Sequence, residues 1–327
     1  MKSPYTGGEV IRQVHKEELE FRGETFTISY NNFKCVDSEK EFTTREIDEL
    51  NMHLLHSAYR RKHNIPFPEE IKEIRKKYGV NQAKMAEILG FGTNTYRNYE
   101  NGDVPQLANA KLISLAANPD HFIELLNDCD SLSDRQKEKF LKNARSAYPN
   151  DQKLLNWLFK YREPNEFTGY KAPSIEKLNA MVAYMALEAN IFKVKMNKLL
   201  FYSDFHHFRK YGQSISGAAY QAIPMGPVPH RYGSLFEYGA ENKAFSIELV
   251  KFPEREGERF VSSQDSTVFD SLTDKEMETV NWIKNSMVLK KTEELIQISH
   301  EEEAWIVNKD NQSLIDYNLA FSLKHPA

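Results

Sequence analysis

Four polar side chains that lie close together in the sequence have the chemistry needed to read DNA bases. They are Thr93, Asn94, Arg97 and Asn98. Their hydroxyl, amide and guanidinium groups match the donors and acceptors that base edges present in the major groove. At helical spacing they occupy the outer side of a short helix, because Tyr96 and Tyr99 fall at i and i+3 on its other side. We expect Arg97 to make the main base contact, and Gln82 and Thr95 to contact phosphates.

Two short helices joined by a tight turn have to position these side chains. Asn81 can cap the first helix, and Gly90 can end it, because a residue without a side chain adopts the left-handed C-cap conformation at little cost. The second helix opens at Thr93 or a neighbouring residue and stops at Asn101-Gly102. The spacing therefore predicts a helix-turn-helix unit, whose second helix lies in the major groove.

This segment resembles the DNA-binding unit of the Cro and phage-repressor superfamily. In that family a Gln opens the first helix of the pair and an aromatic-Glu-x-Gly sequence closes the second; Gln82 and residues 99–102 (YENG) match both features. The resemblance implies a five-helix domain, and we assign its other helices to residues 69–78, 105–116 and the stretch from Pro119 onward. Because one small reading head gives limited affinity, we expect operator DNA to be bound by a homodimer.

The first sixty residues combine short β-like runs with a helix. Residues 9–14, 18–22 and 25–30 read as strands, and apolar residues recur at helical steps between Glu41 and Tyr59. This order resembles the N-terminal zinc ribbon of MqsA-type antitoxins, in which four Cys thiolates close a tetrahedral site. Ser3, Thr6, Cys35 and Ser38 stand in the corresponding places. Neutral hydroxyls bind zinc poorly, so we expect a ribbon that holds no metal and a protein that needs no cofactor.

Composition predicts a globular protein of two or three domains, since 327 residues, 40% of them hydrophobic and 28% charged, exceed the usual size of one domain. The net charge of −4 means that DNA binding has to be argued locally. Residues 60–77 have seven Lys or Arg against three Glu, which suits phosphate contacts about as well as a solvated helix face. With two Cys residues, no hydrophobic signal segment and no apolar run of membrane length, we expect a soluble cytoplasmic protein without membrane attachment.

The C-terminal half carries a second set of motifs. They are residues 197–204 (NKLLFYSD), 216–220 (SGAAY), 226–229 (GPVP) and 299–305 (SHEEEAW). In order and spacing they resemble the Panacea domain over residues 175–323, which implies an antitoxin module that neutralises a toxin by binding it directly. Three prolines around Gly226 restrict the backbone of a loop that we expect to be exposed and suited to recognition. The candidate toxin contacts are Tyr220, Met225, Gly226, Pro227, Val228, Pro229 and Arg231.

The predicted fold is α+β and mainly α-helical. Its predicted domains are a degenerate zinc-ribbon-like domain at 1–60, a helix-turn-helix domain at 67–128, a helical linker at 129–173 and a Panacea-like domain at 174–327. The apolar residues of the linker are expected to pack on a neighbour or in a dimer contact. Catalysis is not expected, because the sequence has no P-loop, dinucleotide fingerprint or nucleophile elbow, and the adjacent His206 and His207 point apart on a helix.

These features predict an antitoxin that binds a cognate protein toxin through its C-terminal domain and represses its own operon by binding operator DNA. The alternative is a prophage-type transcriptional regulator whose C-terminal domain senses a small ligand or mediates assembly. A neighbouring gene that kills cells unless this chain is co-expressed distinguishes the first function from the second.

Overall fold

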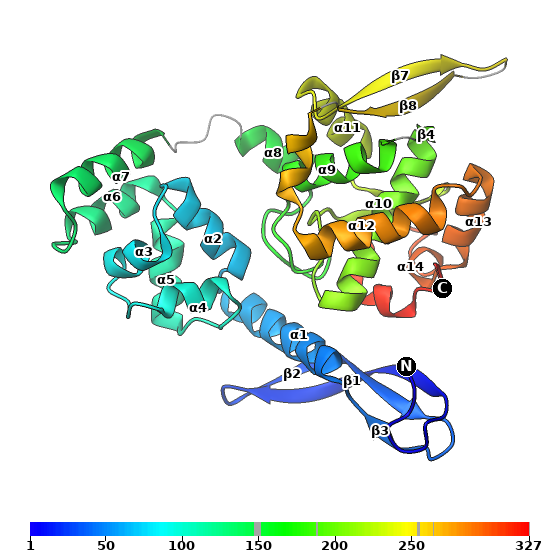
Figure 1. Ribbon diagram of the computed structural model, residues 1–327, viewed down its shortest axis with the longest axis horizontal. Coiled ribbons are helices and arrows are strands. Elements are labelled where there is room, and N and C mark those ends of the chain that lie inside the picture. Colours follow the sequence, from blue (N-terminus) through cyan, green and yellow to red (C-terminus); the bar gives the residue numbers. More distant parts are fainter. Residues whose placement is uncertain (147–151, 188, 254–255, 264, 327) are drawn as a thin grey trace. The chain divides into compact units, whose positions relative to one another are not determined.

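The structure is a computed structural model that describes residues 1–146, 152–187, 189–253, 256–263 and 265–326 (Figure 1). The chain divides into two compact units, Met1–Gln152 and Lys153–Ala327. Helices predominate, with one small sheet among the described residues of the first unit and two among those of the second, which confirms the predicted α+β, mainly α class. Among the described residues, no helix is both long and apolar enough to span a bilayer.

An antiparallel sheet opens the first unit. Its strands, in spatial order, are β1 (Val10–Phe21), β2 (Glu24–Cys35) and β3 (Glu41–Phe42). The prediction of two separate strands within residues 9–22 was wrong, because β1 pairs with β2 along its whole length. Arg22 and Gly23 form the turn between them, and both have positive φ angles, as a tight two-residue hairpin turn requires.

Helix α1 (Arg45–His63) packs on β2 and leads to the helices that follow in the same unit. Residues 41–42, predicted as helical, belong to β3, and the helix begins after Thr44, whose Oγ1 accepts a hydrogen bond from the backbone N–H of Ile47. It also runs past the predicted end at Tyr59, until Asn64 takes the left-handed conformation. The residues that follow are packed, since Ile65 and Phe67 are buried.

Five helices follow within residues 68–127, all of which are described. They are α2 (Pro68–Lys77), α3 (Gln82–Ile88), α4 (Thr95–Glu100), α5 (Leu107–Ala116) and α6 (Pro119–Asn127). The predicted number is confirmed, although α5 begins later than Pro105 because Gln106 is still extended. The helices share one core, which includes Met85, Tyr96 and Phe122.

Helix α7 (Asp134–Ser146) extends the same core. It packs along α6, and Leu132, Phe140 and Ala144 are buried among the helix-turn-helix residues. The first part of the predicted linker therefore packs on its neighbour, which is one of the two expected arrangements. The break predicted at Pro149-Asn150 lies outside the described residues, and α8 (Gln152–Leu158) follows it.

A long buried helix, α10 (Lys193–Tyr211), is the centre of the second unit (Figure 1). Its residues are buried without a break from Met196 to Phe208, because other elements cover it on all sides. The remaining elements of this unit are α9 (Ile175–Ala186), β4 (Ile191–Phe192), β5 (Tyr220–Ile223), β6 (Gly226–Pro229), α11 (Tyr232–Glu241), β7 (Phe245–Lys251), β8 (Glu256–Ser262), η1 (Ser266–Ser271), α12 (Asp274–Met287), α13 (Thr292–Glu301), α14 (Glu303–Ile306) and η2 (Tyr317–Ser322). Helix α12 starts with the capping box of Thr273 and Glu276.

Residues 163–173, the last part of the predicted linker, pack inside the second unit. Asn165, Thr168 and Lys171 are buried, and the backbone carbonyl of Gly169 accepts a hydrogen bond of 2.9 Å from the N–H of Ser214. These contacts tie the segment to the C-terminal half of the chain. The domain limits themselves stay predictions.

Candidate functional sites

Of the residues predicted to read DNA, Arg97 and Asn98 lie on α4, whereas Thr93 and Asn94 precede its first residue, Thr95. Thr93, Asn94, Arg97 and Asn98 are exposed, with Thr95 half-buried beside them. The opposite face is fixed in the core, where the Tyr96 hydroxyl donates to the carbonyl of Ile71 at 2.7 Å and the Tyr99 hydroxyl accepts from Asn109 Nδ2 at 2.9 Å. These two phenols orient α4 so that its polar side chains project outward. Their contact with DNA stays a prediction.

The turn between α3 and α4 has the predicted caps. Asn81 Oδ1 accepts a hydrogen bond of 2.9 Å from the N–H of Lys84 at the start of α3. Gly90 has a φ of +68°, so it ends α3 in the left-handed conformation. Both predictions are confirmed, and the turn sets the direction in which α4 begins.

Glu100 links three helices behind the reading surface. Its carboxylate accepts hydrogen bonds of 2.6 Å from Arg75 Nε on α2 and of 2.6 Å from Gln82 Nε2 on α3. The hydrogen bond to Glu100 raises the pKa of Arg75, and the Glu100 side chain is almost inaccessible to solvent. The amide of Gln82 is thus engaged inside the unit, which the sequence did not reveal, and its predicted phosphate contact stays a prediction.

Several basic residues between positions 60 and 77 are engaged within the protein. Arg60 is buried, Lys62 forms a 2.6 Å ion pair with Glu24, and Lys77 Nζ donates to the carbonyl of Ala117 at 3.0 Å. The positive surface available for phosphates is therefore smaller than the sequence indicates. The exposed Arg97 is therefore the more important candidate for a DNA contact.

The residues in the positions of zinc ligands come together in the ribbon. Cys35 is buried, and Thr6 Oγ1 lies 3.4 Å from its sulfur. Hydrogen bonds from neighbouring hydroxyls lower the pKa of Cys35 to about 6, and the hydroxyl of Ser3 has the largest effect. Hydroxyl groups and one thiol do not fit zinc, which takes Cys and His ligands in structural sites. Across the described residues, His, Cys, Asp and Glu form no group of three suited to a metal ion.

The GPVP sequence is a strand of a hairpin, and the prediction of an exposed loop was wrong. β5 and β6 pair antiparallel through a two-residue turn, Pro224-Met225. Tyr220 and all of β6, which is Gly226, Pro227, Val228 and Pro229, are buried, whereas Met225 is 46% exposed. Of the candidate toxin contacts, Met225 and Arg231 are the two at the surface. The others shape the hairpin from inside.

Lys198 of α10 supports this hairpin. Its ammonium donates to the carbonyl of Pro227 at 3.1 Å, and burial lowers the pKa of Lys198 to about 7. Gly226, with a φ of +95°, leaves the necessary space, because a Cβ there would lie 2.6 Å from Lys198 Nζ and 2.4 Å from Ser299 Oγ. Three motifs that are far apart in the sequence therefore meet at one point, which only the fold shows.

Asp204, in the same motif as Lys198, links that motif to the SGAAY sequence. Its carboxylate accepts hydrogen bonds from the N–H groups of Ile215 and Ser216 at 2.8 Å, from Ser216 Oγ at 2.5 Å and from the Tyr220 hydroxyl at 2.8 Å. Burial raises the pKa of Asp204, although these donors oppose the shift. Its hydrogen-bonding capacity is used within the fold, and His230 lies outside this network. His230 Nδ1 lies 3.3 Å from Gln221 Oε1, so Asp204 and His230 do not form a pair.

The two adjacent histidines also face different elements. His206 Nε2 lies 2.7 Å from the carbonyl of His325, and His207 Nδ1 lies 2.9 Å from Thr279 Oγ1. Burial lowers the pKa of His206 to about 4 and that of His207 to about 3, so both are neutral near pH 7. The pair was predicted to point apart, and this is confirmed.

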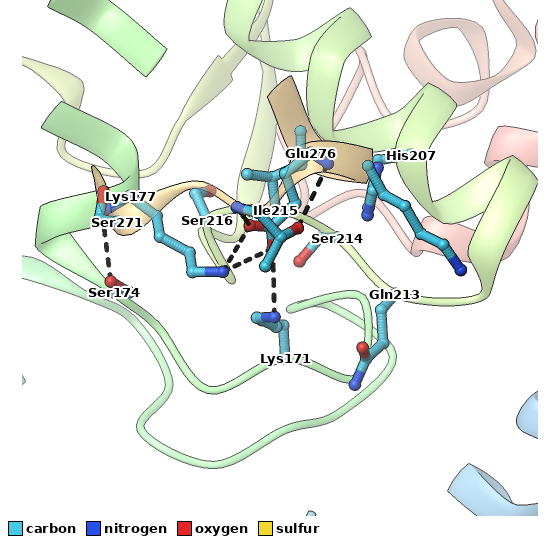
Figure 2. A network of polar contacts seen from close by, with 12 residues as sticks. Lys171, Ser174, Lys177, His207, Gln213, Ser214, Ile215, Ser216, Ser271 and Glu276 are labelled. Carbon is cyan, nitrogen blue, oxygen red and sulfur yellow. Dashed lines mark hydrogen bonds and ion pairs between the residues drawn. The ribbon is translucent and has the colours of Figure 1, made fainter. Parts of the chain in front are cut away.

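A buried ion cluster ties residues 171–177 to α12. Glu276 lies between Lys171 and Lys177 (Figure 2), and its carboxylate is 2.6 Å from Lys177 Nζ and 3.4 Å from Lys171 Nζ. Burial alone would raise the pKa of Glu276, but the two lysines hold it below its usual value. The cluster connects residues 171–177 with α12.

A groove beside the hairpin combines aromatic, apolar and cationic side chains. It has a volume of about 300 Å³, and Trp157 and Arg231 stand at its edge. The Arg231 guanidinium lies 4.4 Å from the centre of the Trp157 ring and donates to the Trp157 carbonyl. Trp157 is 50% exposed. The sequence indicated Trp157 only as one of several apolar residues in the linker, so its place beside Arg231 was missed.

Two parts of the chain resemble two different families of known proteins. The family described as the antitoxin component of a bacterial toxin-antitoxin system, MqsA, matches residues 1–129. The family described as antitoxin SocA-like, Panacea domain, matches residues 196–306. Antitoxin MqsA of Escherichia coli (strain K12) is 30% identical over 125 residues, which are 37% of this chain and 92% of that protein. The two likenesses thus lie in different units.

Proposed function

Because this chain belongs to the MqsA family of antitoxins and also matches the Panacea family, we propose that it neutralises a cognate protein toxin and binds operator DNA. The observation that carries the proposal is the match of two antitoxin families to the two units of one chain. The protein acts in the cytoplasm by binding other macromolecules. Its buried motif residues support this reading, since Asp204 and Lys198 are engaged in hydrogen bonds within the fold.

Toxin neutralisation is assigned to the second unit. Met225, Arg231 and Trp157 are exposed close to the β5–β6 hairpin, and Met, Arg and Trp are enriched in protein–protein interfaces. A specific complex buries on the order of 1,600 Å² in total, so these residues form the centre of a larger contact.

Operator binding is assigned to α4. A homodimer presents two copies of this helix to successive major grooves, about 34 Å apart on the DNA. Arg97 reads bases together with Asn94, Thr93 and Asn98, and repression of its own operon follows from occupancy of this operator.

Two measurements test these assignments. Co-expression with the neighbouring open reading frame should restore growth if that gene encodes the toxin. In a gel-shift titration with the DNA upstream of the gene, Arg97→Ala should weaken binding by about 1–3 kcal/mol, whereas Arg135→Ala on the exposed face of α7 should have little effect. Operator binding without restored growth would favour a transcriptional regulator that has no toxin.

A further inference from the structure

Two arginine side chains of the ribbon hold the chain segment that leaves the reading helix α4. Four consecutive backbone carbonyls in that segment accept hydrogen bonds from them. Arg60 Nη2 donates to Gly102 O at 2.8 Å and to Asp103 O at 3.1 Å, while Arg22 donates through Nη2 to Val104 O at 2.6 Å and through Nη1 to Pro105 O at 2.9 Å.

The four carbonyls lie between α4 and α5, outside any helix or strand. Gly102 turns the chain with a φ of +116°, and Val104 and Pro105 are buried. A buried carbonyl without a partner is costly. A guanidinium presents several N–H donors in one plane, so two arginines can satisfy four acceptors. The path of the segment thus depends on both side chains.

Both arginines are fixed on the ribbon side of the contact. Arg22 is in the turn of the β1–β2 hairpin, and its guanidinium lies 5.2 Å from the centre of the Phe21 ring and 5.4 Å from that of Tyr59. Arg60 is in the last turn of α1 and is only 1% exposed. The contact therefore joins the ribbon to the end of the reading helix within the first unit.

We propose that Arg22 and Arg60 are positioning residues for DNA recognition, and that the ribbon is a brace for the reading helix. The inference rests on the proposed operator binding. Helix α4 has six residues, its start is set by the α3–α4 turn, and its end is set by the two arginines. Because Arg60 is buried, it acts on the operator through α4 and not by touching DNA.

The test is a titration of the full-length chain with a DNA duplex that spans the region upstream of its gene, at several salt concentrations. Arg22→Gln and Arg60→Met are each expected to weaken binding about tenfold. Arg45→Gln removes a charge from the exposed start of α1 and is expected to change affinity less than about twofold. The slope of log affinity against log salt concentration should stay that of the unchanged chain, because losing one phosphate contact lowers it by about one.

Any other outcome contradicts the proposal that the ribbon is a brace for the reading helix. A lower salt slope in Arg22→Gln would identify a phosphate contact. Unchanged affinity in both variants, while Arg97→Ala still weakens binding, would leave the proposed function intact without the brace. A full-length chain that binds no upstream duplex overturns both.

Hydrogen exchange separates positioning from loss of the fold. In Arg22→Gln and Arg60→Met, the amides of residues 102–104 should exchange faster, whereas those of α3 and α5 should keep the rates of the unchanged chain. Faster exchange throughout residues 68–127 would mean that the arginines stabilise the whole domain, and the positioning role would be wrong.

Discussion

The reading helix α4 and the β5–β6 hairpin are held in place in opposite ways. Two buried tyrosines fix α4 from behind, and its polar side chains remain exposed on the front. Lys198 supports the hairpin through its hydrogen bond to the carbonyl of Pro227. Strand β6 is buried along its whole length, so mainly the turn at Met225 reaches the surface. Helix α4 thus exposes one whole polar face, whereas the β5–β6 hairpin exposes mainly its turn.

This difference separates two kinds of motif. The exposed polar set on α4 is available to a partner, whereas the motif residues Lys198, Asp204 and Ser299 of the second unit are buried. Their chemistry is used to hold the hairpin and the segment before it. Recognition by the second unit then has to come from residues around the motifs, such as Met225, Arg231 and Trp157.

The largest expected effect is the loss of stability in the second unit when Asp204 is replaced by Ala. The substitution leaves buried donors of Ile215, Ser216 and Tyr220 without their acceptor, and we expect a loss of about 3–5 kcal/mol in the free energy of unfolding. Urea unfolding followed by tryptophan fluorescence reports on this unit alone, because all three Trp residues lie there.

The matched control for Asp204 is Asp310, which is exposed. Asp310→Ala should change the free energy of unfolding by less than about 0.5 kcal/mol. If Asp204→Ala behaves like this control, the motif residue is not structural and the contrast with α4 disappears.

The next effect is on pH dependence and comes from Lys198. The pKa of this lysine is about 7 in the folded chain against an ordinary value of 10.5. Between these values the unfolded chain binds more protons than the folded one, so the free energy of unfolding rises with pH, by about 1.4 kcal/mol per unit. Lys198→Met should remove this rise between pH 8 and pH 9, as urea unfolding measures.

Lys251, exposed on β7, is the control for this prediction. Lys251→Met should keep the pH dependence of the unchanged chain. Equal slopes for Lys198→Met and the unchanged chain would mean that Lys198 stays charged in the folded chain, and would contradict the lowered pKa.

The smallest effects are expected from two glycine substitutions, which should change the free energy of unfolding in opposite directions. Gly90→Ala should cost about 1 kcal/mol, because the position has open space but a φ of +68°. Gly233→Ala in α11 also meets open space, at an ordinary φ, and should stabilise by less than about 1 kcal/mol. Unfolding of the Gly90→Ala variant can be followed by circular dichroism, and that of the Gly233→Ala variant by tryptophan fluorescence. A stabilising Gly90→Ala would contradict the left-handed cap on which the direction of α4 depends.

The helices of the first unit could be predicted because their signals are local. The cap at Asn81, the glycine at Gly90 and the two tyrosines of α4 act within one or two turns of the chain. The same locality explains the exposed set on α4, since helical spacing alone separates its two faces.

Contacts between distant segments could not be predicted. The continuous strand β1 has a polar middle, and only its pairing with β2 shows that it is one strand. The burial of the GPVP sequence depends on Lys198, which is 29 residues away from Pro227, and the contact of Arg22 with Pro105 spans 83 residues. Periodicity contains no information at such separations.

The measurement that most directly tests two separate binding surfaces on one chain is the growth of cells that express the toxic neighbouring gene. The full chain with Arg97→Ala should restore growth as the unchanged chain does, because α4 takes no part in neutralisation. The full chain with Met225→Glu and Arg231→Glu should fail to restore growth while it still shifts operator DNA. Restored growth with the second variant, or lost growth with the first, would contradict this division of the molecule.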